Sequence, residues 1–206
     1  MRKTIAVIFM VLVFSSPVFS YSTIRNAQNL YPPFDDGSGK GELVGEVYRL
    51  HAKRTSFTRL SSLPQEAQNA TTWNVEAEIL AMEGAGGGIF LIYSRKHGLG
   101  AEIAQDGTLS LLYMEFERDR GTRTWQMAET RLSEVKLPIR LGITFDQYSR
   151  EYSVMVNGAR FLSGNANAAS YVPLIPAFDT LAIKTSNTVL NQQGYCDFGE
   201  IAITAK

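Results

Sequence analysis

The chain has 206 residues, of which 45% are hydrophobic, and its 20 basic and 20 acidic residues give a formal net charge of zero. A chain of this length buries about two-thirds of its unfolded surface around one core, so it needs no disulfide framework. The single cysteine agrees with this. A zero net charge argues against partners held mainly by long-range attraction to phosphate or anionic lipid, so we expect no nucleic-acid partner.

The first 20 residues are typical of a secretory signal peptide. Arg2 and Lys3 precede an apolar run over residues 5–14 that is too short to span a bilayer, and Ser20 is a small residue at the expected cleavage point. We therefore predict removal of residues 1–20 and a secreted or periplasmic product. No cysteine stands near the cleavage point and no second long apolar segment follows, so we expect no membrane anchor.

The mature chain is predicted to contain one domain. Residues 21–40 are polar and broken by two consecutive prolines, which predicts an extended N-terminal segment that ends in a turn. Residues 41–206 are predicted to form a single β-sandwich domain. Asp35 and Asp36 lack the alternating oxygen ligands of a calcium loop, so we expect a plain turn, no metal site and no cofactor.

Apolar residues recur at every second position in several segments, which is the spacing of strands that bury one face. Residues 138–162 show it most clearly, because alternation over 139–145 and again over 152–156 predicts two strands. Asn157-Gly158 follows directly. This dipeptide tolerates positive φ at both central positions of a tight hairpin turn, so a third strand is expected to return antiparallel.

The remaining chain repeats this pattern of short strands and turns. Glycine-rich residues 84–88 and Asp106-Gly107 predict turns, and residues 64–68 allow a short helical turn. Further strands are expected at residues 42–50, 72–82, 89–93, 97–104, 108–116, 122–128, 181–184 and 195–204. About ten short strands without an amphipathic helix predict an all-β fold, an antiparallel β-sandwich of jelly-roll type.

Four of these segments resemble the concanavalin A-like lectin/glucanase superfamily, which also contains laminin G-like jelly rolls. The segments are TWNVEAEI at residues 72–79, GGIFLIYS at 87–94, LGITFDQYSREYSVMVNG at 141–158 and YCDFGEIAI at 195–203. The resemblance implies a two-sheet jelly roll. It implies three kinds of function for the chain, namely lectin-type sugar binding, glycoside hydrolysis or protein interaction.

Glu76 and Glu78 are the candidate catalytic residues. Two residues apart on one strand, they share a face and lie about 7 Å apart, which is near the carboxyl separation of inverting glycosidases. Laminarinase-type members of the superfamily carry an E-x-D-x-E pattern on a strand. This chain has E-x-E followed by Leu80, so hydrolysis by the two glutamates is the alternative hypothesis.

Aromatic residues beside polar groups are the candidate ligand-binding residues, because sugar rings stack on flat aromatic faces while their hydroxyls need hydrogen bonds. The chain offers two such groups, Trp125 with Arg123 and Gln126, and Tyr148 with Asp146 and Arg150. The other interpretation of Trp125 is a core residue.

The leading hypothesis is an exported, non-catalytic module that binds a carbohydrate or another extracytoplasmic surface. The alternatives are a glycoside hydrolase that uses Glu76 and Glu78, and a laminin G-like module that binds proteins. His51 and His97 have no second ligand at metal-binding spacing, so we expect both in surface or loop positions. Cys196 is expected to be a small buried residue in a strand.

Overall fold

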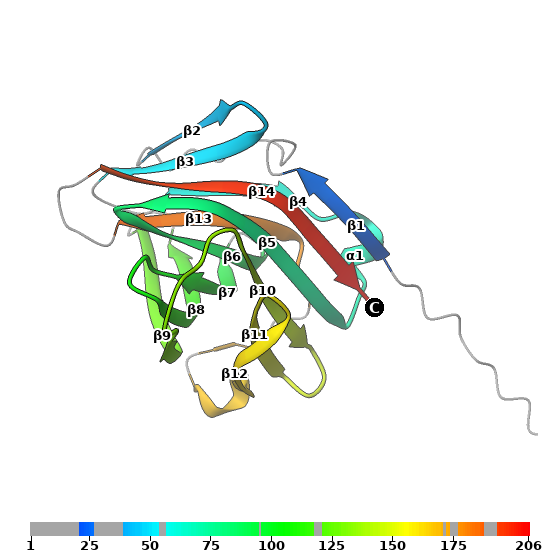
Figure 1. Ribbon diagram of the computed structural model, residues 1–206. Coiled ribbons are helices and arrows are strands. Elements are labelled where there is room, and N and C mark those ends of the chain that lie inside the picture. Colours follow the sequence, from blue (N-terminus) through cyan, green and yellow to red (C-terminus); the bar gives the residue numbers. More distant parts are fainter. Residues whose placement is uncertain are drawn as a thin grey trace, which may run out of the picture.

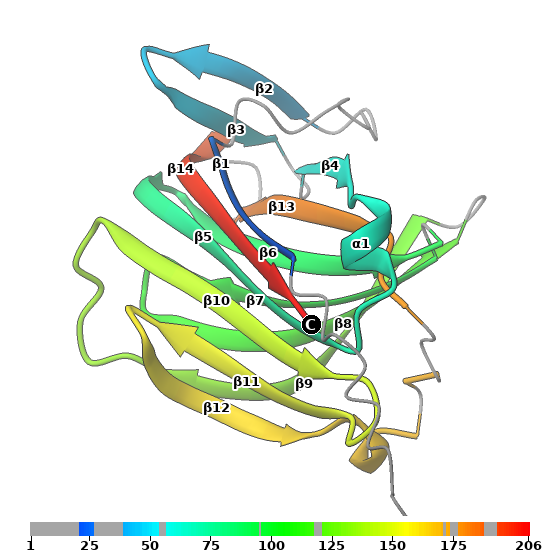
Figure 2. The ribbon, with the colours of Figure 1, turned by 90° about the vertical axis from the view of Figure 1, so that its right-hand side faces the viewer.

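The computed structural model describes residues 21–26, 39–53, 57–94, 96–117, 121–170, 172–173, 177–187 and 193–206. The predicted signal peptide and the predicted turn at Asp35 and Asp36 lie outside these residues. Two antiparallel sheets stack face to face, as Figures 1 and 2 show. The predicted all-β jelly-roll sandwich is confirmed. Within the described part of the chain, no helix is long and apolar enough to cross a membrane.

The first sheet has eight strands among the residues described. Seven follow one another in the order β12-β11-β10-β5-β14-β3-β2, and β1 pairs with β14 beyond the end of β3. Their bounds in that order are β12 Ala159–Asn165, β11 Glu151–Val156, β10 Ile139–Asp146, β5 Thr72–Glu83, β14 Gln193–Ala205, β3 Val47–Lys53, β2 Gly39–Val44 and β1 Tyr21–Asn26. Part of the predicted N-terminal segment is therefore a strand of this sheet.

The second sheet has six strands in the order β4-β13-β6-β7-β8-β9. Their bounds are β4 Phe57–Ser62, β13 Thr180–Asn187, β6 Ala85–Tyr93, β7 His97–Ile103, β8 Thr108–Glu117 and β9 Gly121–Arg131. The short helix α1, Gln65–Gln68, matches the predicted helical turn, and a 3-10 turn, η2, covers Ala166–Ala168.

The core lies between the sheets and follows the alternation of the sequence. In β5 every second residue from Trp73 to Ile79 is fully buried, and the residues between them are half-buried. Phe178 packs edge-to-face on Trp73 and on Phe145, with ring centroids 5.0 and 5.5 Å away. The Trp73 indole N–H donates to the Ala67 carbonyl at 2.9 Å, which ties α1 to the core.

The six-stranded sheet buries residues on both faces, since all residues of β6 from Ala85 to Ile92 are buried. A second cluster lies on its outward face and consists of Phe90, Ile92, Leu112, Met114 and Ala182. The predicted glycine-rich turn is wrong beyond Gly84, because residues 86–88 lie inside β6. Small residues are needed on this face, since a Cβ at Gly100 would collide with the Phe90 ring.

Two hairpin turns show how glycine sets the chain path. Asn157 and Gly158 have φ of 50° and 77°, which confirms the predicted tight turn between β11 and β12. The single strand predicted over residues 42–50 is wrong, because β2 and β3 are separate strands joined at Gly45, whose φ is 64°. Such a φ favours glycine because a side chain would strain the backbone.

Candidate functional site

Turns from both sheets meet at one end of the sandwich. Phe178 packs on Phe145, which lies near the end of β10, just before the turn at residues 147–150. The next residue, Asp179, accepts the main-chain N–H of Ser94 in the β6–β7 turn at 2.7 Å. We call this the aromatic end, after rings that lie there: His97, Tyr113, Trp125 and Tyr148.

Three rings of the aromatic end lie side by side across β7, β8 and β9. Tyr113 and Trp125 are directly opposite in the register, with ring centroids 5.3 Å apart. His97 stacks on Tyr113 at 6.1 Å, and its Nδ1 forms a 2.7 Å hydrogen bond with the Tyr113 hydroxyl. Tyr113 is 1% exposed, whereas Trp125 is half-buried and packs against the core. The stack therefore runs from the interior to the surface.

The state of the Tyr113 hydroxyl follows from its surroundings. Burial raises the pKa of Tyr113 to about 12, and the charge of Glu115 adds to this shift. The hydroxyl therefore keeps its proton at physiological pH and can donate it to a neutral His97. This contact orients the imidazole within the stack.

Charged groups stand in the next row of the same three strands. His97, Glu115 and Arg123 are directly opposite one another on β7, β8 and β9. Glu115 is half-buried and Arg123 is exposed. The row offers carboxylate oxygens as acceptors and guanidinium N–H groups as donors next to the aromatic stack.

The predicted group around Trp125 is only partly brought together. Arg123 and Trp125 are two residues apart on one face of β9, so they share the side that carries the stack. Gln126 lies on the opposite face, where it pairs with Leu112 of the outward apolar cluster. Sequence reasoning missed Tyr113 and His97, because only the pairing of β7, β8 and β9 places them beside Trp125.

The predicted group around Tyr148 forms one turn with distinct parts. Tyr148 is 81% exposed. Asp146 accepts the Ser149 main-chain N–H at 2.8 Å and the Thr72 hydroxyl at 2.9 Å, and these hydrogen bonds lower the pKa of Asp146. Arg150, only 8% exposed, donates to the carbonyls of residues 172 and 173 at 3.2 and 3.1 Å. Asp146 and Arg150 therefore hold the turn that presents Tyr148.

Glu76 and Glu78 lie on the outer face of the eight-stranded sheet, and both are half-buried. Glu78 accepts the Glu200 main-chain N–H at 3.3 Å. The Arg140 guanidinium lies 2.9 Å from the Glu200 carboxylate and 3.9 Å from that of Glu78. The two glutamates thus face away from the core, whereas the aromatic stack lies on a core-facing side.

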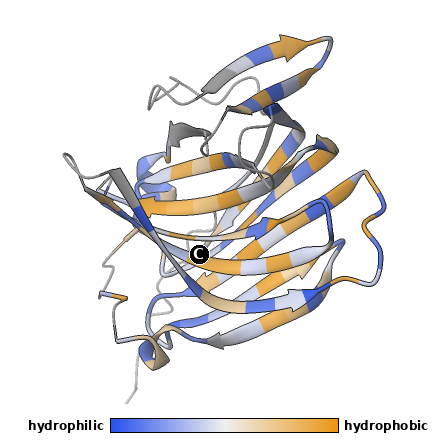
Figure 3. Ribbon diagram, turned by 90° about the vertical axis from the view of Figure 1, so that its left-hand side faces the viewer, coloured by the Kyte–Doolittle hydropathy of each residue, from blue (hydrophilic) through white to orange (hydrophobic). Residues whose placement is uncertain are grey.

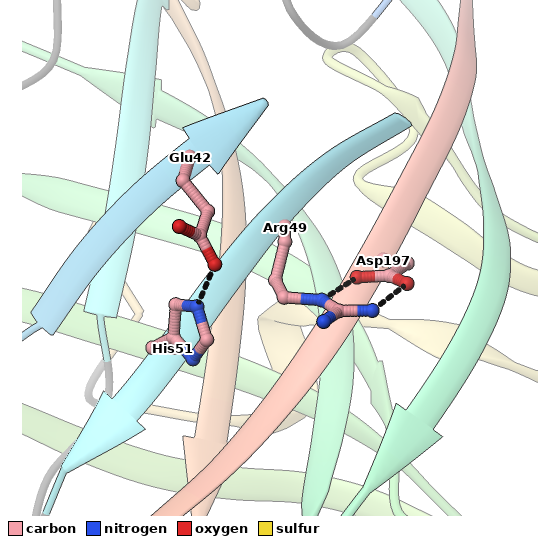
Figure 4. A network of polar contacts seen from close by, with 4 residues as sticks. All are labelled: Glu42, Arg49, His51 and Asp197. Atoms are coloured by element: carbon pink, nitrogen blue, oxygen red, sulfur yellow. Dashed lines mark hydrogen bonds and ion pairs between the residues drawn. The ribbon is translucent and has the colours of Figure 1, made fainter. Parts of the chain in front are cut away.

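A second polar network on this outer face was missed in the sequence (Figure 4). Arg49 donates from Nε and Nη2 to the two carboxylate oxygens of Asp197 at 2.7 and 2.8 Å, and this pairing raises the pKa of Arg49. The guanidinium lies 3.9 Å from the ring centroid of Tyr195. His51, expected at the surface, contacts Glu42 at 2.7 Å through Nε2. The network crosses β2, β3 and β14 and so joins segments far apart in the sequence.

Cys196 is fully buried, as predicted, and burial raises the pKa of its thiol. The thiolate, which is the nucleophilic form, is therefore disfavoured. Among the residues that the structure describes, no group of three or more His, Cys, Asp or Glu side chains could hold a metal ion.

Comparison with known proteins identifies the fold. No protein-family model and no curated protein matches the chain. The carbohydrate recognition domain of Emp46p in its potassium-bound form matches 88% of this chain and 87% of its own, with a TM-score of 0.54 and 9% identity. The CBM2 module of the evolved Dit of Lactobacillus casei BL23 phage J-1 matches 89% of each chain, with a TM-score of 0.53 and 10% identity. This chain has the concanavalin A-like jelly-roll fold.

A Bacillus licheniformis β-glucanase shares this concanavalin A-like fold, with a TM-score of 0.51 and 9% identity over 93% of this chain and 100% of its own. Such low identities show the fold alone. One fold thus occurs in a carbohydrate recognition domain, a CBM2 module and a glucanase, so the function of this chain has to be argued from its own side chains.

Proposed function

We propose that this chain is an exported, non-catalytic module that binds carbohydrate at the aromatic end of its sandwich. The observation that carries the proposal is the stack of His97, Tyr113 and Trp125, which ends in a half-buried indole beside the exposed Arg123. A sugar ring needs a flat apolar surface and polar groups at its edge. The aromatic end offers both.

The stack suits a binding site because it is rigid before the ligand arrives. Trp125 packs on Tyr113, whose ring is buried in the core and whose hydroxyl is hydrogen-bonded to His97. An aromatic platform held in place loses little conformational entropy when a sugar binds. Glu115 and Arg123 supply an acceptor and donors for sugar hydroxyls in the adjacent row.

Tyr148 is the second platform in this proposal. It lies at the same end on the other sheet, and its turn is held by Asp146 and Arg150. An exposed tyrosine on a fixed turn can stack on a sugar ring while its hydroxyl forms hydrogen bonds. Asp146 and Arg150 act in this proposal as positioning residues rather than as ligand contacts, because Asp146 accepts hydrogen bonds from Ser149 and Thr72 and Arg150 is buried against the carbonyls of residues 172 and 173.

Two further points support the ligand class and the location. The Emp46p carbohydrate recognition domain and the CBM2 module have the same fold as this chain. The sequence of residues 1–20 supports export, which would bring the module into contact with extracytoplasmic glycans.

A glycan array with the mature chain from Tyr21 tests the proposal. We expect binding to a limited set of glycans, and loss of that binding in Trp125→Ala and Tyr148→Ala. Phe161→Ala is the matched control, because Phe161 is an exposed aromatic residue, 45% exposed, on β12. Binding that survives Trp125→Ala in a folded protein contradicts the site, and no binding to any glycan favours the protein-interaction alternative.

A further inference from the structure

The β2–β3 hairpin forms one edge of the eight-stranded sheet, and its turn end extends beyond the last residue pair between β3 and β14 (Figures 1 and 2). All residues from Gly41 to Glu46 are exposed. Leu43 is 57% exposed and Val44 is 38% exposed, and Figure 3 shows this apolar end of β2. Successive side chains of a strand point to opposite faces, so each face of this hairpin tip carries one exposed apolar residue of β2.

β2 is also an open edge of the eight-stranded sheet. Among the described strands it pairs only with β3. The pair Val44 and Val47 flanks the two-residue turn, and such flanking pairs exchange both main-chain hydrogen bonds. By alternation, the N–H and C=O groups of Gly41 and Leu43 point away from β3. They form a template on which another strand can pair.

Two other edge strands, β9 and β12, carry features that discourage strand addition. β9 exposes the charged side chains of Arg123, Glu129 and Arg131. The pairing of β12 with β11 is irregular at Val154/Met155. Charges and bulges are common ways to protect sheet edges. The described tip of β2 carries two exposed apolar residues, Leu43 and Val44, beside one exposed carboxylate, Glu42.

We infer that β2 pairs with β2 of a second copy of this chain, antiparallel about a two-fold axis, to form a homodimer with one continuous sheet. Such an interface uses the same edge of both copies and leaves no open edge between them. Removal of residues 1–20 takes away Arg2 and Lys3, so the mature chain keeps only a small negative net charge and overall repulsion between the copies is weak.

The residues of β2 select the register of this pairing. An axis through Leu43 places Leu43 opposite its own copy and Val44 opposite Glu42, which covers both exposed apolar residues. An axis through Glu42 would set two carboxylates directly opposite each other, which is destabilising. An axis through Gly41 would place Leu43 opposite Gly39, so less apolar surface would be buried.

The dimer is weak and depends on concentration, because one short strand pair buries less than the roughly 1,200 Å² of a stable interface. It has a functional consequence that rests on the proposed function. A dimer with two aromatic ends would bind a repeated glycan with higher avidity without any new sugar contact. The association itself is measured without glycan, so its failure and the failure of glycan binding are separate results.

Sedimentation velocity over a range of protein concentrations tests the dimer. We expect the sedimentation coefficient of the mature chain to rise with concentration, and Leu43→Lys to weaken association by about tenfold or more, because two lysines would meet at the axis. Phe161→Lys, at an exposed position on the β12 edge, is the control and keeps the wild-type behaviour. A monomer at every concentration, or equal association of Leu43→Lys, overturns the inference.

Chemical crosslinking tests the position of the axis. The native Cys196 is fully buried, so a cysteine introduced at an exposed position is the reactive thiol. A short bis-maleimide reagent is expected to join two copies of Leu43→Cys and to leave Phe161→Cys monomeric. Crosslinking of Phe161→Cys alone would move the contact to β12 and overturn the inference.

Discussion

Arg49 and Asp197 lie 148 positions apart in the sequence, yet the guanidinium of Arg49 donates two hydrogen bonds to the carboxylate of Asp197, at 2.7 and 2.8 Å. The pair joins β3 to β14, and the Asp197 side chain is only 7% exposed. The two parallel hydrogen bonds fix the geometry of the pair. Loss of either partner would leave the other charge uncompensated, which is costly where one member is buried.

Asp197→Ala should therefore lower the free energy of unfolding. We expect a loss of about 1–3 kcal/mol, less than for a fully buried pair because Arg49 is 25% exposed. Urea unfolding measures it. Glu134→Ala is the control, since Glu134 pairs with Lys136 on the surface and should contribute less than about 1 kcal/mol. Equal effects of the two substitutions would contradict a special contribution of Asp197.

The acid sensitivity of the fold should depend partly on Asp146. The N–H of Ser149 and then the hydroxyl of Thr72 lower the pKa of Asp146 in the folded state. A lowered folded pKa gives stability that is present above the unfolded pKa of about 4 and is lost as the pH falls through the folded pKa. Asp146→Asn should therefore flatten the loss of unfolding free energy below about pH 4. An unchanged pH profile would show that these hydrogen bonds do not stabilise the carboxylate.

The hydroxyl and the ring of Tyr113 should have separable effects. Tyr113→Phe removes the hydrogen bond to His97 and keeps the ring against Trp125, so we expect a loss of about 1 kcal/mol of stability and retained glycan binding. Tyr113→Leu removes the aromatic support of Trp125 and should weaken binding. Thermal unfolding and the glycan assay measure the two effects. If binding depends on the hydroxyl alone, the stack is not the platform.

A double variant of Glu76 and Glu78 distinguishes a binding module from a glycoside hydrolase. In the proposed module, the double variant Glu76→Gln/Glu78→Gln should bind glycans as the wild type does, because both residues lie on the outer face of β5. Reducing-end assays on bound glycans should detect no cleavage by the wild type. Cleavage that disappears in the double variant would establish the glycoside hydrolase alternative.

Two glycines of β7 should respond differently to substitution. Gly100→Ala would place a Cβ against the Phe90 ring and the main-chain carbonyl of Ile89, and we expect a loss of about 1–3 kcal/mol from overpacking. At Gly98 the nearest atoms to such a Cβ, on Met114 and Phe116, lie 3.4 Å away, so Gly98→Ala should be nearly neutral. Thermal unfolding compares them. Similar melting temperatures would mean that the Phe90 ring and the main chain of β6 move aside without cost.

The local pattern of the chain determined most of the strands. Alternation in β5 and β10 identifies the buried faces because a strand turns each successive side chain to the opposite side of the sheet. The Asn157-Gly158 turn is equally local, since two residues with positive φ specify it. These features depend on neighbours in sequence and so can be predicted without knowing the partners.

Where a partner strand sets the geometry, the sequence pattern failed. Residues 42–50 alternate as one strand does, but the chain reverses at Gly45 because β2 folds back on β3. In β14 strict alternation would keep Cys196 and Thr204 on one face. The register on β5 shifts between Asp197 and Ile201, so Ile203 is buried there and Thr204 is not. Such a bulge adjusts one strand to its neighbour, so its position depends on the pair.

The candidate site likewise has features that the sequence predicts and features that depend on the tertiary structure. The sequence by itself determined which aromatic and charged residues were available near Trp125 and Tyr148, and that Arg123 and Trp125 share one face of their strand. Only the tertiary structure decided that His97 and Tyr113 support Trp125, and that Arg49 meets Asp197. The physical reason is that periodicity specifies the face of a strand, whereas hydrogen-bonded pairing between distant strands specifies which side chains meet on that face.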